Sequence, residues 1–400
     1  MSAMKYLPLT RLYLLVTLVF ALALAGCGGT ADNEAEPPLA NTGVTETTDE
    51  TEAEAPAVPA PAGEQVAIRF WMQQDNRLVT AMEGLIASFE EAHPNIDVQL
   101  DSFPFAEYHQ KISTAFAGND APDAFWMDVR TASLAEQGVL LPLDDYITEE
   151  NRADYLASTW LEPTYEGVTY GIPMHQLTEA LYVNTDLAEA AGIELPASLD
   201  EAWTWDEFVE AATALTQRSG DVVDVWGFGV QRQLQDWSVL PVVYQNNGTV
   251  LSDDLRTATG HLNSSETVAA LGWYGDLFAE HRVISVEPIP DGFQTGKIAL
   301  FQAPSTFRPV LENDFPDLDY TIVPLFRDDS CSVMTGGWNV SMSATTAHPE
   351  ETWLFVDWIT REKHAQWVEE SGYLPARHSV IEAGSAYGEY PWNIFMEQLQ

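Results

Sequence analysis

The chain has 400 residues, of which 61 are Asp or Glu and only 17 are Lys or Arg, so its formal net charge is −44. This charge excludes nucleic acids and anionic lipid surfaces as main partners, because both are polyanions. Apolar residues make up 46% of the chain, which is enough for two packed domains. We attribute the acidity to a solvated surface suited to a saline or acidic medium; it also permits a cationic ligand.

Residues 1–26 have the features of a secretion signal. Lys5 and Arg11 give a positive flank, and the apolar run 12–25 is shorter than the roughly 20 residues that a membrane-spanning helix needs. The signal ends in LAGC at 24–27, which resembles the lipobox of bacterial lipoproteins. The resemblance implies cleavage before Cys27 and lipidation of its thiol. We therefore expect an extracytoplasmic protein, lipid-anchored at the outer face of the bacterial cell membrane or periplasmic.

Residues 27–65 are predicted to be a disordered tether behind the lipidated Cys27. Ala, Pro, Thr, Glu and Asp dominate this segment, and such a composition cannot bury enough apolar surface to order itself. With Cys27 lipidated, Cys331 has no partner for an intramolecular disulfide. We expect Cys331 to fill a buried or half-buried position.

After residue 65, strand and helix patterns alternate. Apolar residues at 78, 82, 85, 86 and 89 recur at helical spacing, and His93-Pro94 ends that helix. Ser133 with Glu136 predicts a capping box for a helix that Gly138 ends. This alternation indicates parallel strands covered by helices. The remaining predicted elements of this part are strands at 66–70, 96–100 and 124–127 and a helix at 108–116.

The same alternation continues to the end of the chain. Thr204 and Glu207 form a capping box that opens a helix through Ala214. Further strands are predicted at 181–184, 226–230, 298–301, 320–324 and 340–343, with helices at 268–280 and 352–359. Ligands of open α/β sheets lie at the carboxyl ends of the strands. The candidate rims are therefore residues 73–76, 128–130, 175–179 and 305–307.

Motifs of catalysis and cofactor binding are missing from the sequence. No HExxH, GxSxG or dinucleotide glycine fingerprint occurs, and GFQTGK at 292–297 lacks the glycine spacing of a phosphate loop. The eight His residues have no metal-ligand spacing. We therefore expect no catalytic residues, no cofactor and no metal.

Several of the thirteen Trp residues stand beside polar residues in the sequence. A sugar site would need this arrangement, because sugar faces stack on indole rings while the hydroxyl groups hydrogen-bond to polar side chains. A single Trp is more often a packing residue, and both interpretations stay open for Trp237 and Trp338. The Trp residues with polar neighbours are Trp71, Trp126, Trp205, Trp237, Trp338 and Trp392.

From Val66 onward, a series of motifs resembles family 1 of the extracellular solute-binding proteins of ABC transporters, the group that includes the maltodextrin-binding proteins. Each motif is loose, and their order along the chain carries the resemblance. The motifs are IRFWMQQDN, AGNDAPDAFWMDVRTASLAEQGVLLPLDDY, YEGVTYGIPMHQLTEALYVNTDLAEAAGI, WTWDEFVEAATALT, TGKIALF, MTGGWNVSMSATTAHPEETWLFVDWIT and ESGYLPAR.

This resemblance implies an α/β, two-lobed fold of the periplasmic-binding-protein kind (type II), with a ligand cleft between lobes joined by hinge crossovers. Lobe 1 would contain residues 66–173 and 325–384, and lobe 2 residues 174–324 and 385–400. The crossings would fall at 170–173, at 321–324 and near 383–387. Relatives continue with further helices, so we expect the C-terminal part of lobe 2 to be truncated at Gln400.

The resemblance also implies a ligand site, position by position. Gln73 and Asp75 match polar residues of the maltodextrin binders, and Trp126 and Arg130 match a stacking Trp and an Arg. Ser305 stands where those proteins have a second stacking Trp, so maltodextrin itself is not implied. The predicted ligand-binding residues are Trp71, Gln73, Asp75, Trp126, Asp128, Arg130, His175, Glu179, Gln235, Trp237, Ser305, Trp338 and Asn339.

The function that the resemblance implies is capture of a sugar or oligosaccharide by a lipid-anchored, monomeric binding protein, which delivers it to an ABC import permease. One alternative is a non-sugar solute such as a polyamine or glycerol phosphate. A polyamine fits the acidity and the aromatic residues, whereas a phosphate asks for clustered basic residues. The other alternative is a secreted glycoside-active enzyme, which would need two carboxylates facing each other at about 5 to 10 Å.

Overall fold

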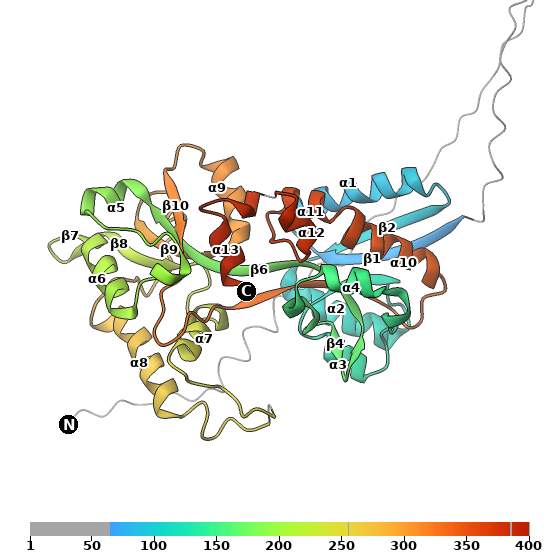
Figure 1. Cartoon of the computed structure of the whole chain (residues 1–400), viewed down its shortest axis with the longest axis horizontal. Coiled ribbons are helices and arrows are strands. Elements are labelled where there is room, and N and C mark those ends of the chain that lie inside the picture. Colours follow the sequence, from blue (N-terminus) through green and yellow to red (C-terminus); the bar gives the residue numbers. More distant parts are fainter. Residues whose placement is uncertain (1–64, 255, 385, 400) are drawn as a thin grey trace, which may run out of the picture. The chain divides into compact units, whose positions relative to one another are not determined.

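The computed structural model describes residues 65–254, 256–384 and 386–399. Cys27, the predicted signal 1–26 and all of the predicted tether except residue 65 lie outside the described residues. The centre of the fold is a nine-stranded mixed sheet (Figure 1) with the order β2-β1-β3-β11-β6-β9-β8-β7, in which β10 also pairs with β6. The strands are β1 (Val66–Gln73), β2 (Ile96–Phe103), β3 (Ala124–Met127), β6 (Gly171–Asn184), β7 (Gln217–Ser219), β8 (Val222–Val230), β9 (Ile298–Pro304), β10 (Tyr320–Val323) and β11 (Thr335–Met342), with a separate hairpin of β4 (Thr164–Tyr165) and β5 (Val168–Thr169).

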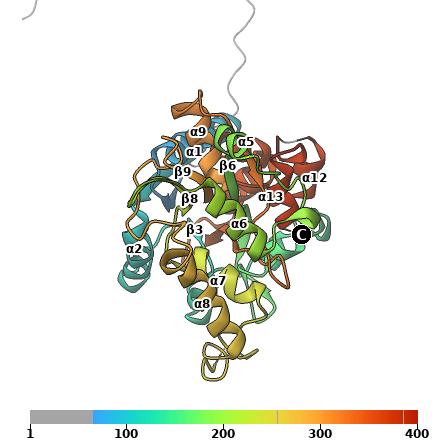
Figure 2. The same cartoon turned by 90° about the vertical axis from the view of Figure 1, so that its left-hand side faces the viewer.

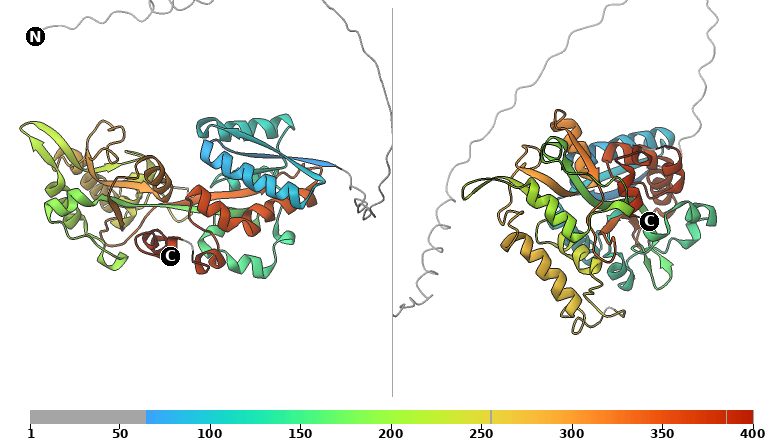
Figure 3. Two further views of the ribbon diagram at one scale, coloured as in Figure 1. Left: turned by 90° about the horizontal axis from the view of Figure 1, so that it is seen from above. Right: turned by 60° about the vertical axis from the view of Figure 1, so that its left-hand side comes forward.

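Strand β6 joins the two parts of this sheet. Its first half, up to Thr178, pairs with β11, and its second half, from Glu179, pairs with β9 and β10. All 14 of its residues are buried. We call β1, β2, β3, β11 and the first half of β6, with their helices, lobe 1, and the second half of β6 with β7 to β10 lobe 2. Figure 3 shows β6 running from one lobe to the other.

The expected parallel arrangement of strands is only partly correct. β1 is parallel to β2 and β3, and β8 is parallel to β9. β11 is antiparallel to both β3 and β6, and β6 is antiparallel to β9 and β10. The reason is that β6 leaves lobe 1 whereas β11 returns to it, so adjacent crossing strands run in opposite directions. Residues 175–179 therefore lie in the middle of β6 and not at a strand end, as the sequence analysis expected.

Lobe 1 covers its sheet with helices. In α1, Leu78, Met82, Leu85, Ile86 and Phe89 are buried against the sheet, as their helical spacing predicts. The predicted capping box of Ser133 is wrong, because α3 begins at Thr131 and Ser133 lies inside it. The helices of this lobe are α1 (Asn76–Ala92), α2 (Phe105–Gly118), α3 (Thr131–Glu136), α4 (Glu149–Asp154), α10 (Pro349–Asp357) and α11 (His364–Ser371), with a π-helical turn at Trp358–Glu362.

Lobe 2 has its own apolar cluster. The ring of Phe208 lies 4.9 Å from that of Phe228 and 4.1 Å from that of Phe326. The predicted capping box is confirmed, because Thr204 and Glu207 exchange both hydrogen bonds at the start of α6. Figure 2 shows α6, α7 and α8 on the side of this lobe that faces the viewer. The helices are α5 (Thr185–Ala191), α6 (Trp205–Leu215), α7 (Asp236–Gln245), α8 (Ser265–Ala279) and α9 (Arg308–Asp314).

The last helices, α12 (His378–Glu382) and α13 (Asn393–Gln398), return to the crossing. Ile394 and Phe395 of α13 are buried in the same apolar cluster as lobe 1. Gln398 donates a hydrogen bond to the Glu179 carbonyl oxygen (2.7 Å) and accepts one from the Leu325 amide (3.0 Å). These bonds attach α13 to the middle of β6.

Cys331 is exposed, contrary to the expected buried or half-buried position. It lies in the connection between β10 and β11, and such connections run over the surface because their backbone groups need water.

Over residues 65–254, 256–384 and 386–399, every helix is too short or too polar to cross a membrane.

Candidate functional site

Strand β11 contributes to an aromatic group. Gly336 and Trp338 are two residues apart on this strand and so share a face. The Trp338 ring stacks on His109 of α2 (centroids 6.0 Å apart, planes at 6°) and meets the ring of Phe105 edge-on at 6.3 Å. Trp338 is only 8% exposed, whereas Phe105 is 52% exposed. Phe105 is therefore the aromatic residue of this group that a solute can reach.

Two distant segments converge on Gly336. A methyl group placed on Gly336 would lie 3.4 Å from Cζ2 of Trp237, on α7 of lobe 2, and 3.7 Å from Oε1 of Glu162, which follows α4 in lobe 1. The glycine thus leaves room between an indole ring and a carboxyl group. We call Phe105, His109, Asp128, Glu162 and Trp237, gathered around Gly336 and Trp338, the β11 site.

Glu162 is held in a setting that favours its protonated form. Burial, followed by the nearby charge of Asp128, raises the pKa of Glu162 to about 7, although the backbone N–H of Gly337 donates a hydrogen bond that opposes the shift. At neutral pH this carboxyl group can therefore change its charge in response to a solute.

Asp128 and Arg130, both predicted site residues, lie together after β3. The Asp128 carboxylate accepts hydrogen bonds from the Arg130 guanidinium and backbone N–H (the latter 3.0 Å) and lies 3.2 Å from Nε2 of His109. Burial alone would raise the pKa of Asp128, but the hydrogen bond from His109 and the nearby Arg130 bring the pKa below its usual value. Since Arg130 already pairs with Asp128, it is not a free cation for an anionic solute.

Glu179 lies at the crossing of β6, 1% exposed. Its Oε2 accepts a hydrogen bond of 2.7 Å from Gln302 of β9, whereas Oε1 has no partner among the described residues. Burial raises the pKa of Glu179 to about 7, against the hydrogen bond from Gln302 and the charge of Arg232. The Arg232 guanidinium in turn lies 5.0 Å from the centre of the Trp237 ring. Glu179 thus belongs to the same neighbourhood as Trp237.

Other predicted site residues are packing residues in this structure. Trp126 is 0% exposed, and its ring lies 5.4 Å from those of His175 and Trp367 and 5.5 Å from that of Trp338. His175 is equally buried, and its Nδ1 accepts a hydrogen bond of 3.0 Å from Trp367. Burial, followed by the charge of His364, lowers the pKa of His175 well below its usual value. The side chains of Trp126 and His175 are too deeply buried to contact a solute in this conformation. Together they pack beneath Trp338.

Three more of the predicted residues are also enclosed. The Trp71 indole donates a hydrogen bond of 3.0 Å to Asp101 of β2 and is 7% exposed. Ser305 is 0% exposed, and Asn339 is 2% exposed and accepts a hydrogen bond of 3.3 Å from Thr131. The strand pattern does not reveal this burial, because the sheet is covered on both faces.

The remaining predicted residues lie at the ends of elements. Gln73 is the half-buried last residue of β1. Asp75 is the N-cap of α1 and accepts hydrogen bonds from the backbone N–H groups of Arg77 (3.0 Å) and Leu78 (3.3 Å). Gln235 is the exposed N-cap of α7, two residues before Trp237.

The sequence analysis missed Phe105, His109, Glu162, Arg232 and Gln302. Glu162 stands in a loop with no motif, and only the fold brings it to Gly336. A weaker signal existed for Phe105 and His109, because FAEYH at 105–109 places two aromatic residues and an imidazole within about one helical turn of each other.

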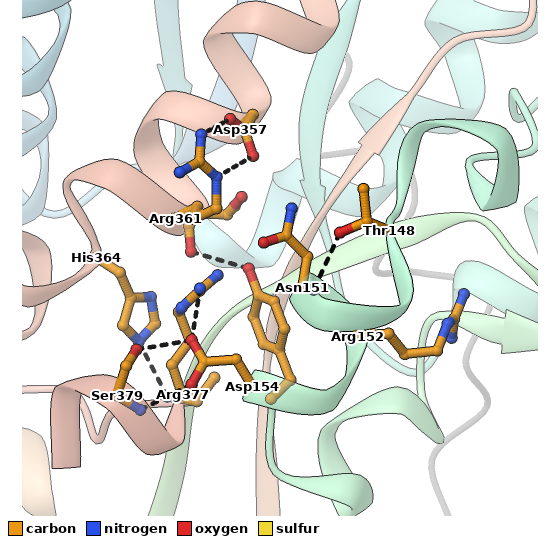
Figure 4. Close-up of polar contacts among 12 residues, drawn as sticks. Thr148, Asn151, Arg152, Asp154, Asp357, Arg361, His364, Arg377 and Ser379 are labelled. Atoms are coloured by element: carbon orange, nitrogen blue, oxygen red, sulfur yellow. Dashed lines mark hydrogen bonds and ion pairs between the residues drawn. The ribbon is translucent and has the colours of Figure 1, made fainter. Parts of the chain in front are cut away.

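A second polar cluster lies in lobe 1, away from the β11 site (Figure 4). Asp154 pairs with Arg377 (2.5 Å) and accepts hydrogen bonds from the backbone N–H (2.8 Å) and hydroxyl (2.7 Å) of Ser379. Buried His364 accepts a hydrogen bond of 3.0 Å from the backbone N–H of Ala376. The cavity beside these residues has a volume of about 10 Å³, room for about one water molecule. This cluster fastens the segment around Arg377 to α4 and is structural.

A larger cavity of about 140 Å³ lies within lobe 2 between β8, β9 and residues 284–289. Its floor contains Phe228 and Phe301, and Gln231 and Gln233 line its polar side. In the part of the chain that the structure describes, no three His, Cys, Asp or Glu side chains gather in a way that could hold a metal ion.

A sheet shared by two lobes through crossing strands, with polar and aromatic side chains gathered at the crossing, defines a two-lobed α/β binding protein. The chain belongs to the family of bacterial extracellular solute-binding proteins, whose family model matches residues 75–366. Members of this family bind solutes and are not enzymes, so the glycoside-active alternative is set aside.

Individual relatives agree with this assignment. The chain is 23% identical to an arabinooligosaccharide-binding protein of Halalkalibacterium halodurans over 322 residues, which is 76% of this chain and 69% of the relative. An ABC substrate-binding protein of Listeria monocytogenes in complex with cycloalternan has the same fold, with a TM-score of 0.72, 22% identity and coverage of 84% of this chain and 87% of that chain. The GacH receptor of Streptomyces glaucescens, solved in complex with acarbose, has a TM-score of 0.71, 25% identity and coverage of 84% and 87%.

Proposed function

We propose that the protein captures a neutral sugar or oligosaccharide at the β11 site and delivers it to an ABC import permease. The observation that carries this proposal is the convergence of the Trp237 indole and the Glu162 carboxyl group over Gly336. A sugar ring can stack on the indole while its hydroxyl groups donate hydrogen bonds to the carboxylate. The printed ligands of the relatives, arabinooligosaccharide, cycloalternan and acarbose, support the same class.

An anionic solute such as glycerol phosphate fits the site poorly. The carboxyl groups of Asp128 and Glu162 belong to the site, the buried Glu179 lies near Trp237, and Arg130 is already paired with Asp128. A polyamine is the second candidate, because these same carboxyl groups would attract a cation and an indole ring would cover it.

We further propose that Cys27 carries the lipid anchor and that the protein acts as an extracytoplasmic monomer with its permease.

A thermal-shift screen of the full chain tests the solute class. The panel contains raffinose, maltotriose, an arabinotriose, spermidine and glycerol 3-phosphate. A solute at about 100 times its Kd stabilises the protein by about 2.7 kcal/mol, so a sugar should raise the Tm clearly. A rise with spermidine alone would replace the sugar by a polyamine, and a rise with glycerol 3-phosphate alone would refute the argument from charge.

Two variants locate the binding. Trp237→Ala should abolish the sugar response, because it removes the stacking surface. Tyr390→Ala, which removes an aromatic ring that is 51% exposed elsewhere on the molecule, should leave the response unchanged. An undiminished response in Trp237→Ala would move the solute away from the β11 site.

A further inference from the structure

The setting of Glu162 has a consequence for how the solute binds, one that rests on the proposed function. Its Oε1, from lobe 1, lies 3.7 Å from a methyl group placed on Gly336, and Cζ2 of the Trp237 indole, from lobe 2, lies 3.4 Å from the same methyl group. Any solute that stacks on Trp237 above Gly336 must contact this carboxyl group or displace it.

Three parts of the fold bring groups close to Glu162. β11 presents the backbone N–H of Gly337, and the segment after β3 presents the carboxylate of Asp128. α7 presents the uncharged indole of Trp237, with Arg232 at 5.0 Å from the ring centre. Asp128 itself pairs with Arg130, and its carboxylate lies 3.2 Å from Nε2 of His109, so both of these side chains are directed at Asp128.

We propose that Glu162 is a direct solute-binding residue that releases a proton when a sugar binds, so that capture is linked to pH. Hydroxyl groups of the sugar donate hydrogen bonds to the ionised carboxylate and therefore favour its charged form. In the free protein, burial and Asp128 keep part of the Glu162 population protonated near neutrality, where its pKa of about 7 lies. Binding then shifts that population to the carboxylate, and the proton leaves to solvent.

The direction of the pH effect follows from this linkage. Above pH 7 the carboxylate is already formed, and the affinity reaches its highest value. As the pH falls below 7, the sugar must bind against a protonated group, and the affinity should fall by up to about tenfold per pH unit. The protein would hold its solute in neutral or alkaline surroundings and lose it in acid.

Isothermal titration tests the proposal with the sugar that gives the largest Tm rise among raffinose, maltotriose and arabinotriose. Titrations at pH 7 in two buffers of different ionisation enthalpy count the protons released. The wild-type protein should release a fraction of a proton, and E162Q should release less and bind at least about tenfold more weakly at pH 8. E166Q, which removes an exposed carboxylate four residues away, should behave as wild type.

Glu179 also has a pKa of about 7, so E179Q is needed to measure its share of the released protons.

Glycine variants test whether the solute occupies the space over Gly336. G336A should fold normally, because the added methyl group meets its neighbours at ordinary contact distances, but it should weaken sugar binding at least about tenfold. G275A on α8, where an added methyl group meets nothing within 4 Å, is the matched control.

The possible outcomes separate the two proposals. If no sugar in the panel binds, the proposed function fails and the linkage fails with it. If a sugar binds but E162Q leaves both the proton count and the affinity unchanged, the function stands and Glu162 is not a binding residue. Uptake of a proton on binding would also overturn the proposal, because Glu162 would then bind as the neutral acid.

Discussion

At the scale of single residues, tryptophans with similar neighbours in the sequence differ in burial. Trp126 follows Phe125 on a strand whose four residues are all buried, because helices and neighbouring chain cover both faces of the sheet. Trp237 lies on α7 and is only partly buried. Both are among the predicted ligand-binding residues: Trp126 matches a stacking Trp of the maltodextrin binders, whereas for Trp237 packing stayed open beside solute binding. Burial on both faces of a strand depends on the complete fold, and this is why no local pattern separates the two.

Exchanging these two residues for alanine should therefore give contrasting results. Trp126→Ala removes a fully buried ring and should lower the free energy of unfolding by about 3 to 5 kcal/mol, measured by urea denaturation. Trp237→Ala should change that free energy by less than about 1.5 kcal/mol and chiefly weaken sugar binding in calorimetry. Equal losses of stability in both variants would contradict this division.

At the scale of elements, sequence patterns predict best where a single helix face or cap decides the outcome. The apolar spacing of α1 and the capping box of α6 are confirmed. β6 was predicted only at 181–184, whereas it spans Gly171–Asn184. The missed half contains His175, Gln176 and Glu179, which are unusual in a buried strand. They are satisfied only in part: Nδ1 of His175 accepts a hydrogen bond from Trp367, and Oε2 of Glu179 accepts one from Gln302, whereas His175 Nε2 and Glu179 Oε1 have no partner among the described residues.

The Asp154 cluster shows how a short helix holds a distant segment. Hydrogen bonds from Ser379, together with the Arg377 charge, bring the pKa of Asp154 below its usual value, against the opposing effect of burial. A carboxylate with a lowered pKa in the folded state stabilises above its unfolded pKa of about 4, and this stabilisation is lost as the pH falls through the lower folded value.

Asp154→Asn should accordingly destabilise the protein by about 1.5 to 3 kcal/mol at pH 7, in urea denaturation. The difference from wild type should shrink steadily below pH 4, where the wild-type carboxylate also becomes neutral. A difference that stays constant down to pH 2 would show that the loss arises from packing and not from charge.

At the scale of the whole molecule, charge is the dominant property. The carboxylates behind the net charge of −44 repel one another most strongly in the compact folded state.

The family and the two-lobed fold could be predicted from the order of the motifs, whereas the β11 site could be predicted only in part. Trp237, Asp128 and Trp338 were identified, but Glu162 and Phe105 reach the site through loops and helix ends that the sequence does not position.

Because its carboxylates repel one another in the folded state, the protein should be stabilised by salt. The Debye length falls from about 30 Å at 0.01 M to about 3 Å at 1 M salt, and the repulsion among carboxylates falls with it. The Tm measured by calorimetry should rise by several degrees over this range, equally with NaCl and KCl. A flat or falling Tm would show that neighbouring cations already neutralise the surface in the folded state.

The position of β11 also sets the order in which the molecule can be completed during synthesis. β3 and β6 leave the ribosome before the strand that lies between them, Thr335–Met342. Until it arrives, β3 has one unpaired edge, the first half of β6 has no partner strand, and Trp126 has no Trp338 to cover it. Exposed apolar strand edges are sites of aggregation. A nascent chain of this topology therefore needs shielding until Thr335–Met342 has been made, and a chain interrupted before residue 335 would remain prone to aggregation even when its earlier helices had formed.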